Sequence, residues 1–231
     1  MLQLQRQNDM MRLLSEKKEL TVKELCALLY CSPATVRRDL AELEGKGLLK
    51  RSFGGAVINE TFADQLPLFL RSAERVAEKK RICAKAVRFF RPGETVFLDA
   101  STTTFFLAPL LKGIDGLTVI TNNPHLSIKL SEYRVHNFCT GGEMLNDSIA
   151  FVGDEAIRFV GGIYAHAFFF SARGVADGEI SDSSKAERDI KIAMFERSAR
   201  RYFLCDSTKV GQRYPYTVTT LSHVDATVDE Q

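Results

Sequence analysis

Two helix-start signals follow one another closely near the beginning of this chain, and they constrain its fold more than any other feature. Thr21 and Glu24 form a capping box, in which the two side chains reciprocally satisfy free backbone N–H groups. Ser32 supplies a second N-cap, and Pro33 occupies the first helical position, where its missing N–H costs nothing. Tyr30-Cys31, between them, is long enough only for a turn. The sequence therefore predicts two helices joined by a tight turn.

A further helix precedes this pair. It is expected over Gln5–Lys17, and the helix that begins at Pro33 should end near Gly45 and Gly47. Apolar residues at helical spacing predict the buried faces of the three helices, which comprise Met10, Leu13, Leu14, Leu25, Leu28, Leu29, Val36, Leu40 and Leu43. The three helices together are expected to form one small core.

A two-stranded wing is expected after the third helix. Its strands, Leu48–Arg51 and Ala56–Ile58, lie on either side of Gly54-Gly55. Helices in this order, followed by such a hairpin, are typical of a winged helix-turn-helix, whose last helix enters the major groove of DNA. A small helical bundle without a DNA partner has the same caps, so these residues alone leave both interpretations open.

The outward side of the third helix supplies the candidate DNA contacts. Its positions outside the buried stripe are Ala34, Thr35, Arg37, Arg38, Asp39 and Glu42. The planar guanidinium of arginine matches guanine O6 and N7, or two phosphate oxygens, and basic side chains on the wing would hold the flanking backbone. The candidate DNA-binding residues are Ser32, Ala34, Thr35, Arg37, Arg38, Lys50 and Arg51.

Helices and short apolar strands alternate in the rest of the chain. Residues 59–73 lack periodicity and are expected to be a linker, after which a helix should run from Glu74 to Phe90. The expected strands are Thr95–Asp99, Leu117–Thr121, Val135–Thr140, His166–Ser171 and Tyr202–Asp206, and the expected helices between them are Phe105–Leu111, Pro124–Ser131, Asp154–Val160 and Ala186–Arg197. This alternation predicts an α/β domain over residues 74–231, with a mostly parallel sheet covered on both faces.

Polar or glycine-rich residues follow each of these strands. The carboxyl ends of parallel strands meet at one edge of a sheet, where ligands bind, and a helix start there favours an anion. Lys209 is the obvious cation for a phosphate. The candidate ligand-binding residues are Asp99, Ser101, Thr102, Thr103, Thr104, Thr121, Asn122, Gly141, Gly142, Gly174, Asp206 and Lys209. For the Ser/Thr run taken alone, a cluster of helix caps is the better explanation of the residues.

Composition excludes several other classes of protein. The five cysteines and four histidines are dispersed without ligand spacing, so we expect reduced thiols, no metal site and no cofactor. No apolar run is long enough for a membrane span, and the N-terminus lacks the pattern of a secretory signal, so we expect a cytoplasmic protein. The net charge of +2 permits a nucleic-acid partner without indicating one.

The N-terminal residues resemble a known family. The segment that carries the resemblance is SPATVRRDLAELEGKGLLKRSFGGAV, which is similar to the N-terminal signature of the DeoR family of bacterial transcription regulators. That signature has a Ser, a Thr-[Ile/Val]-Arg-Arg-Asp-Leu core, a Leu-Glu, a Gly-x-[Leu/Ile] and a Gly-Gly-Ala, all present here in order. Phe53 departs from it, because the family usually has His there. The resemblance implies double-stranded operator DNA as a partner, and repression.

The C-terminal region resembles the sugar-phosphate-sensing domain of the same family. The matching elements are Asp99–Thr104, Thr121-Asn122, Gly141-Gly142 and Asp206–Gly211. The resemblance implies a phosphorylated sugar as effector and a fold related to ribose-5-phosphate isomerases. Ser101 stands where the family has Gly, and Lys185 where an acidic residue is common, which raises the alternative of a regulator that has lost ligand sensing.

An enzyme is the other alternative. An aldose–ketose isomerase would use the same phosphate loop, with Asp99, Asp206 and Lys209 as the available catalytic groups, but it would leave the helix-turn-helix without a role. We therefore expect no catalytic residues. A homo-oligomer, a dimer or higher, is expected because one recognition helix covers only half of a typical operator.

Overall fold

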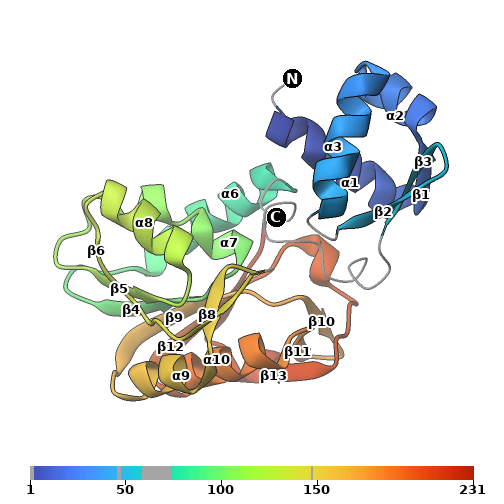
Figure 1. Ribbon diagram of the computed structural model, residues 1–231. Helices are drawn as coiled ribbons and strands as arrows, with labels where there is room; N and C mark the ends of the chain where they lie inside the picture. The colour runs from blue at the N-terminus through green and yellow to red at the C-terminus, as the bar shows by residue number, and fades with distance from the viewer. Residues whose placement is uncertain (1–2, 46–47, 59–73, 147) are drawn as a thin grey trace. The chain divides into compact units, whose positions relative to one another are not determined.

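The computed structural model describes residues 3–45, 48–58, 74–146 and 148–231. The chain divides into two compact units, Met1–Glu74 and Arg75–Gln231, which are described separately (Figure 1). The linker predicted at residues 59–73 lies outside the described residues. The division predicted at residues 58 and 74 therefore stays a prediction.

The N-terminal unit packs its helices against a small antiparallel sheet. Its elements are α1 (Gln3–Lys17), β1 (Glu19–Thr21), α2 (Val22–Leu29), α3 (Pro33–Gly45), β2 (Leu49–Ser52) and β3 (Gly55–Ile58). The sheet order is β1-β3-β2, so the predicted wing is present and gains a third strand that the sequence did not indicate. β1 has only three residues, too few to show an alternating pattern.

Both predicted helix caps are present. Thr21 Oγ1 accepts a hydrogen bond from the Glu24 amide at 3.2 Å, and the Glu24 carboxylate accepts one from the Thr21 amide at 2.8 Å. Ser32 Oγ accepts one from the Thr35 amide at 3.3 Å, at the start of α3. The buried apolar core agrees with the predicted stripe except at Leu13 and Leu28. Leu13 is half-buried, and Leu28 is 42% exposed because the short helix α2 buries Leu25 and Leu29 instead.

The assignment of Asp39 to the outward side of α3 was wrong. Asp39 is completely buried and forms an ion pair with Arg6 of α1, in which Arg6 Nε contacts one carboxylate oxygen and Nη2 lies 3.2 Å from the other. Gln3 and Gln7 of α1 each donate a hydrogen bond of 2.6 Å to the Glu42 carboxylate. Polar contacts therefore fix α1 along α3.

The C-terminal unit is built on a six-stranded sheet. The strands lie in the order β14-β12-β9-β4-β5-β6, and every pairing is parallel. In chain order they are β4 (Thr95–Leu98), β5 (Thr118–Thr121), β6 (His136–Cys139), β9 (Ala165–Phe170), β12 (Ser198–Leu204) and β14 (Ala226–Val228). The predicted α/β fold with a mostly parallel sheet is confirmed, and β14 is an additional strand.

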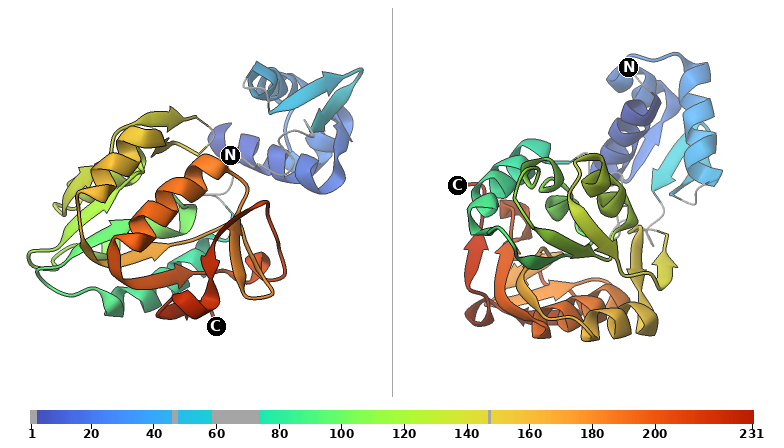
Figure 2. Two further views of the ribbon diagram at one scale, coloured as in Figure 1. Left: turned by 90° about the horizontal axis from the view of Figure 1, so that it is seen from below. Right: turned by 90° about the vertical axis from the view of Figure 1, so that its left-hand side faces the viewer.

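Both faces of this sheet are covered (Figure 2). On one face lie α6 (Val76–Ala86), α7 (Thr102–Phe105) and α8 (Pro124–Glu132); on the other lie α9 (Gly153–Gly161) and α10 (Lys185–Glu196). In the central strand β9, Phe169 packs on the face covered by α6 and α8, whereas Phe168 and Phe170 pack on the face covered by α9 and α10. All three are fully buried. Burial on both faces explains the continuous apolar runs in the sequence.

Two features of this unit differ from the predictions. The helix expected over Phe105–Leu111 is replaced by the single turn α7 and a 3-10 helix at Ala108–Leu110, because Pro109 has no N–H for a regular helix. Small antiparallel additions were also missed. They are the hairpin β7 (Glu143–Leu145) with β8 (Ala150–Val152), and the sheet of β10 (Gly174–Ala176), β11 (Glu179–Asp182) and β13 (Tyr216–Thr220).

The cysteines carry no disulfide. All five are free; Cys83 and Cys205 are buried, and the other three are half-buried. None of the helices in the described ranges combines the length and apolar character that a bilayer crossing requires.

The buried ion pair gives a stability prediction. We expect Asp39→Ala to destabilise the N-terminal unit by about 3–5 kcal/mol, because it removes the carboxylate that neutralises buried Arg6. Glu44→Ala is the matched control: its partner Arg51 is 47% exposed, so the cost should stay below about 1 kcal/mol. Calorimetric unfolding of both variants tests this, and equal losses would contradict it.

Candidate functional site

The outward side of α3 presents polar and basic side chains to solvent. Ser32, Ala34, Arg37 and Arg38 are exposed, and Thr35 is half-buried with its hydroxyl 2.9 Å from Ser32 Oγ. Among the described residues, Arg37 and Arg38 have no hydrogen-bond or ion-pair partner. Both guanidinium groups are therefore available to an external anion.

The wing adds two more cations. Lys50 is exposed and has no partner within the described residues, whereas Arg51 is held by Glu44 through its side chain at 2.8 Å and its amide at 2.9 Å. Arg51 would have to leave this carboxylate to bind a phosphate. Among the candidate DNA contacts, Lys50, Arg37 and Arg38 are thus the cations without a partner in the described residues.

In the C-terminal unit, Asp99 is the centre of a buried polar network. It follows β4 and accepts hydrogen bonds of 3.2 Å from the amides of Ser101 and Ser171, the latter at the end of β9. Lys191 of α10 lies 3.6 Å from its carboxylate and 2.5 Å from that of Asp182. Burial raises the pKa of Asp99, and Lys191 and the hydrogen bonds oppose this shift only in part.

The ends of β9 and β12 meet at Lys209. Its ammonium donates to Ser171 Oγ at 2.5 Å and lies 3.3 Å from the Asp206 carboxylate. Burial opposes ionisation of Asp206, but Lys209 and hydrogen bonds from Thr208 hold the pKa of this carboxyl below its usual value. The geometry therefore brings Asp99, Asp206 and Lys209 together through Ser171.

The Ser/Thr run forms a closed turn. Ser101 Oγ caps the Thr104 amide at 3.2 Å, and the Thr104 hydroxyl donates to the Asp99 carbonyl at 2.8 Å. Ser101 has φ −72°, so the position does not need glycine. Thr103 is fully buried, and α7 has only four residues, so the helix-dipole contribution expected here is smaller than a long helix would give. The Ser101 amide is already bonded to Asp99, so only the amides after it in this turn can be offered to an anion.

Thr121 and Asn122 hold the neighbouring strand end. The buried Thr121 hydroxyl accepts from the Asn123 amide at 3.1 Å, and Asn122 Nδ2 donates to the Phe151 carbonyl at 3.0 Å. The Asn122 amide oxygen is buried without a hydrogen-bond partner in the described structure. This oxygen is a candidate acceptor for a sugar hydroxyl.

The predicted glycines permit close backbone approaches. A Cβ at Gly142, whose φ is +109°, would lie 2.6 Å from the Val152 carbonyl oxygen and would press on the first turn of α9. A Cβ at Gly174 would lie 2.2 Å from the Gln212 carbonyl oxygen. Gly174 thus lets the segment after Lys209 lie against β10, and Gly141, with φ +67°, completes the turn after β6. These glycines shape the candidate site without supplying ligand groups.

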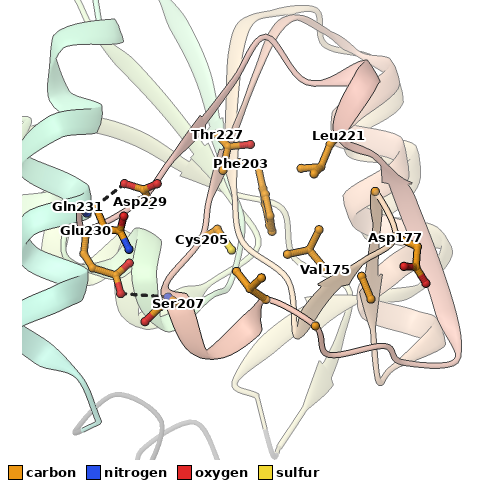
Figure 3. Close-up of a pocket in the computed structure, with 14 residues that line it drawn as sticks. Val175, Asp177, Phe203, Cys205, Ser207, Leu221, Thr227, Asp229, Glu230 and Gln231 are labelled. Carbon is orange, nitrogen blue, oxygen red and sulfur yellow. Dashed lines mark hydrogen bonds between the residues drawn. The ribbon is translucent and has the colours of Figure 1, made fainter.

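A pocket of about 570 Å³ lies beside the ends of β12 and β14 (Figure 3). Its floor includes Val175 and Phe203, and carboxylates of Asp177, Asp229 and Glu230 surround it. The twelve predicted ligand-binding residues are not among those that line it. Three carboxylates repel a phosphate, so this pocket does not suit a phosphorylated ligand.

Sequence reasoning missed three members of the network. Ser171 connects Asp99 to Lys209, while Asp182 and Lys191 supply the buried charges behind Asp99. The spacing between Asp182 and Lys191 is visible in the sequence. Asp182, however, ends β11, which belongs to the separate antiparallel sheet and not to the parallel one. No local pattern indicates that this strand end lies beside β4.

Two family models match the chain. Residues 6–62 match the DeoR-like helix-turn-helix domain, and residues 74–231 match the DeoR C terminal sensor domain. Similar curated proteins include the HTH-type transcriptional regulator GolR of Listeria innocua, 31% identical over 100% of this chain and 91% of that protein. The lactose phosphotransferase system repressor of Staphylococcus epidermidis is 34% identical over 90% of this chain and 84% of that protein.

Solved structures with similar folds are more distant. The eIF2B delta subunit of Chaetomium thermophilum has a TM-score of 0.52 and 11% identity, over 71% of this chain and 59% of that chain. Ribose 5-phosphate isomerase A of Neisseria gonorrhoeae has a TM-score of 0.43 and 18% identity, over 58% of this chain and 54% of that chain. The first likeness concerns the fold alone, and the second is too low to support an argument.

The Asp99–Lys191–Asp182 cluster predicts a pH-dependent stability. Lys191→Met should cost about 3–5 kcal/mol at pH 7, because two buried carboxylates lose their cation. A carboxyl whose folded pKa is raised destabilises the fold when ionised, and this cost disappears as the pH falls through that pKa. The deficit relative to wild type should therefore shrink on acidification.

Thermal unfolding from pH 7 towards pH 5 measures this effect. Lys185→Met, on the same helix, is the control, since its ion pair with Asp189 involves a lysine that is 66% exposed. A Lys191→Met deficit that stays constant with pH would contradict the buried charge cluster.

Proposed function

This chain belongs to the DeoR family of transcriptional regulators and binds DNA through its helix-turn-helix domain, and we propose that it represses a carbohydrate-metabolism operon under the control of a phosphorylated sugar. The observation that carries the proposal is the unpaired basic side of α3, with Arg37 and Arg38 exposed. The name of the lactose phosphotransferase system repressor supports repression and the carbohydrate class.

The proposed DNA contacts divide by chemistry. Arg37, Arg38 and Lys50 neutralise phosphates or read guanine. Ser32, at the N-cap of α3, and Ala34 and Thr35, in its first turn, lie where side chains meet base edges. Arg51 joins them by exchanging Glu44 for a phosphate. A two-fold dimer would place one such helix in each half of an operator.

The proposed effector site is the network at the carboxyl edge of the sheet. Lys209 and the free amides of the turn after Ser101 bind the phosphate, and Asn122 and Asp99 bind sugar hydroxyls. Support comes from the shared edge of the parallel strands and from the contacts that join Asp99, Ser171 and Lys209. Ser101 has an ordinary φ, so its backbone fits the turn without strain, which supports a retained phosphate site.

Salt titration of DNA binding tests the first half of the proposal. On an operator selected from random DNA by the full chain, Arg38→Gln should weaken binding at least about tenfold. For a phosphate contact, the slope of log K against log salt should also fall by about 0.9. Arg81→Gln, an exposed arginine of α6, is the matched control. Wild-type affinity for Arg38→Gln would overturn the proposed interface.

Ligand-dependent unfolding tests the second half. A sugar phosphate that binds should raise the melting temperature. At a ligand concentration of one hundred times its Kd, binding adds about 2.7 kcal/mol to the free energy of unfolding. Lys209→Met should abolish this ligand-induced shift, and Lys112→Met, at an exposed lysine, should retain it. The shift is compared within each variant, because losing Lys209 also leaves Asp206 without its cation. Turnover of the sugar phosphates would instead favour the isomerase alternative.

A further inference from the structure

Both aromatic residues in the described part of the N-terminal unit are on its surface. Tyr30 is 94% exposed and Phe53 is fully exposed, while the core of the unit is aliphatic apart from Met10 and Met11. Single exposed rings are common and need no explanation. The backbone of Tyr30 distinguishes it from Phe53.

Tyr30 has a left-handed conformation at the end of α2. Its φ is 52° and its ψ is 44°, and its amide donates to the Cys26 carbonyl as the helix cap. An L-residue in this region is disfavoured, and helices that end this way usually use glycine. In the described structure, the Tyr30 side chain has no hydrogen bond and no ring contact. The fold therefore carries local strain for a side chain that contributes nothing to its packing.

The place of Tyr30 indicates what this side chain contacts. It lies in the turn immediately before Ser32, the N-cap of α3, and Arg37 and Arg38 follow on the exposed side of that helix. The first turn of a recognition helix lies in the major groove, so the residues just before it are close to the sugar-phosphate backbone. Tyrosine hydroxyls are frequent donors to phosphate oxygens.

We propose that Tyr30 is a DNA contact, whose phenol hydroxyl donates a hydrogen bond to a phosphate oxygen at the edge of the groove that α3 enters. This inference rests on the DNA interface proposed above. It assigns the strained turn a function that glycine cannot perform. Since tyrosine is neutral, the contact adds affinity without releasing a counterion.

Two variants separate binding from folding. Tyr30→Gly removes the side chain and relieves the strain, and the extra freedom of glycine in the unfolded chain offsets that relief, so the melting temperature should change little. Operator affinity should fall at least about tenfold, because the acceptor is a charged phosphate oxygen and such hydrogen bonds are stronger than neutral ones. Tyr30→Phe should lose a similar amount, and the salt slope of both variants should stay at the wild-type value.

The outcomes distinguish this inference from the proposed function. Tyr164→Phe, at a tyrosine 62% exposed in the other unit, should bind DNA like wild type. If Arg38→Gln weakens binding while Tyr30→Gly does not, the interface stands and the Tyr30 contact is overturned. If neither weakens binding, the interface itself fails. If Tyr30→Gly lowers the sedimenting mass of the DNA-free protein, Tyr30 contacts a second copy of the chain and the DNA contact is overturned.

Discussion

The arrangement of the C-terminal unit depends on the burial of β9 between β4 and β12. Phe168, Phe169 and Phe170 alternate between the two layers, so this strand is covered on both faces and its register with its neighbours is fixed. Because all three strands run parallel, the residues that follow them emerge at one edge. Asp99, Ser171 and Lys209 thereby come within hydrogen-bonding distance, although they are far apart in the sequence. The candidate effector site is a direct result of this register.

The N-terminal unit uses a different device to position its functional helix. Its core is small, and the buried pair of Arg6 and Asp39 adds a directional contact between α1 and α3 that apolar packing lacks. Along the sequence, Asp39 directly follows the exposed Arg37 and Arg38 and precedes the buried Leu40. One short segment of α3 therefore combines two of the proposed DNA contacts, Arg37 and Arg38, with the residue that fixes the helix in its own unit.

Local signals in the sequence predicted most of the secondary structure. The caps at Thr21 and Ser32 and the alternation from Thr95 onward were sufficient, since each depends on near neighbours. The errors involve longer-range effects. Asp39 appeared exposed because its partner Arg6 lies on another helix, and Leu28 appeared buried because spacing alone does not define the edge of a stripe. In the candidate site, Lys191 and Ser171 escaped prediction because their roles depend on the packing of α10 and β9, which periodicity does not describe.

Gly174 shows how a loop of the candidate effector site is positioned by a residue that offers no group to a ligand. The backbone of Gln212 lies where a side chain at residue 174 would begin, and the Gly211 amide donates to the Val175 carbonyl at 2.8 Å beside it. The position of the loop that carries Lys209 thus depends on the absence of a Cβ atom at Gly174, and no side-chain contact is needed to hold it there. Within such a family, ligand preference can change through substitutions that shift a neighbouring backbone by a fraction of an ångström, with every ligand-contacting residue retained.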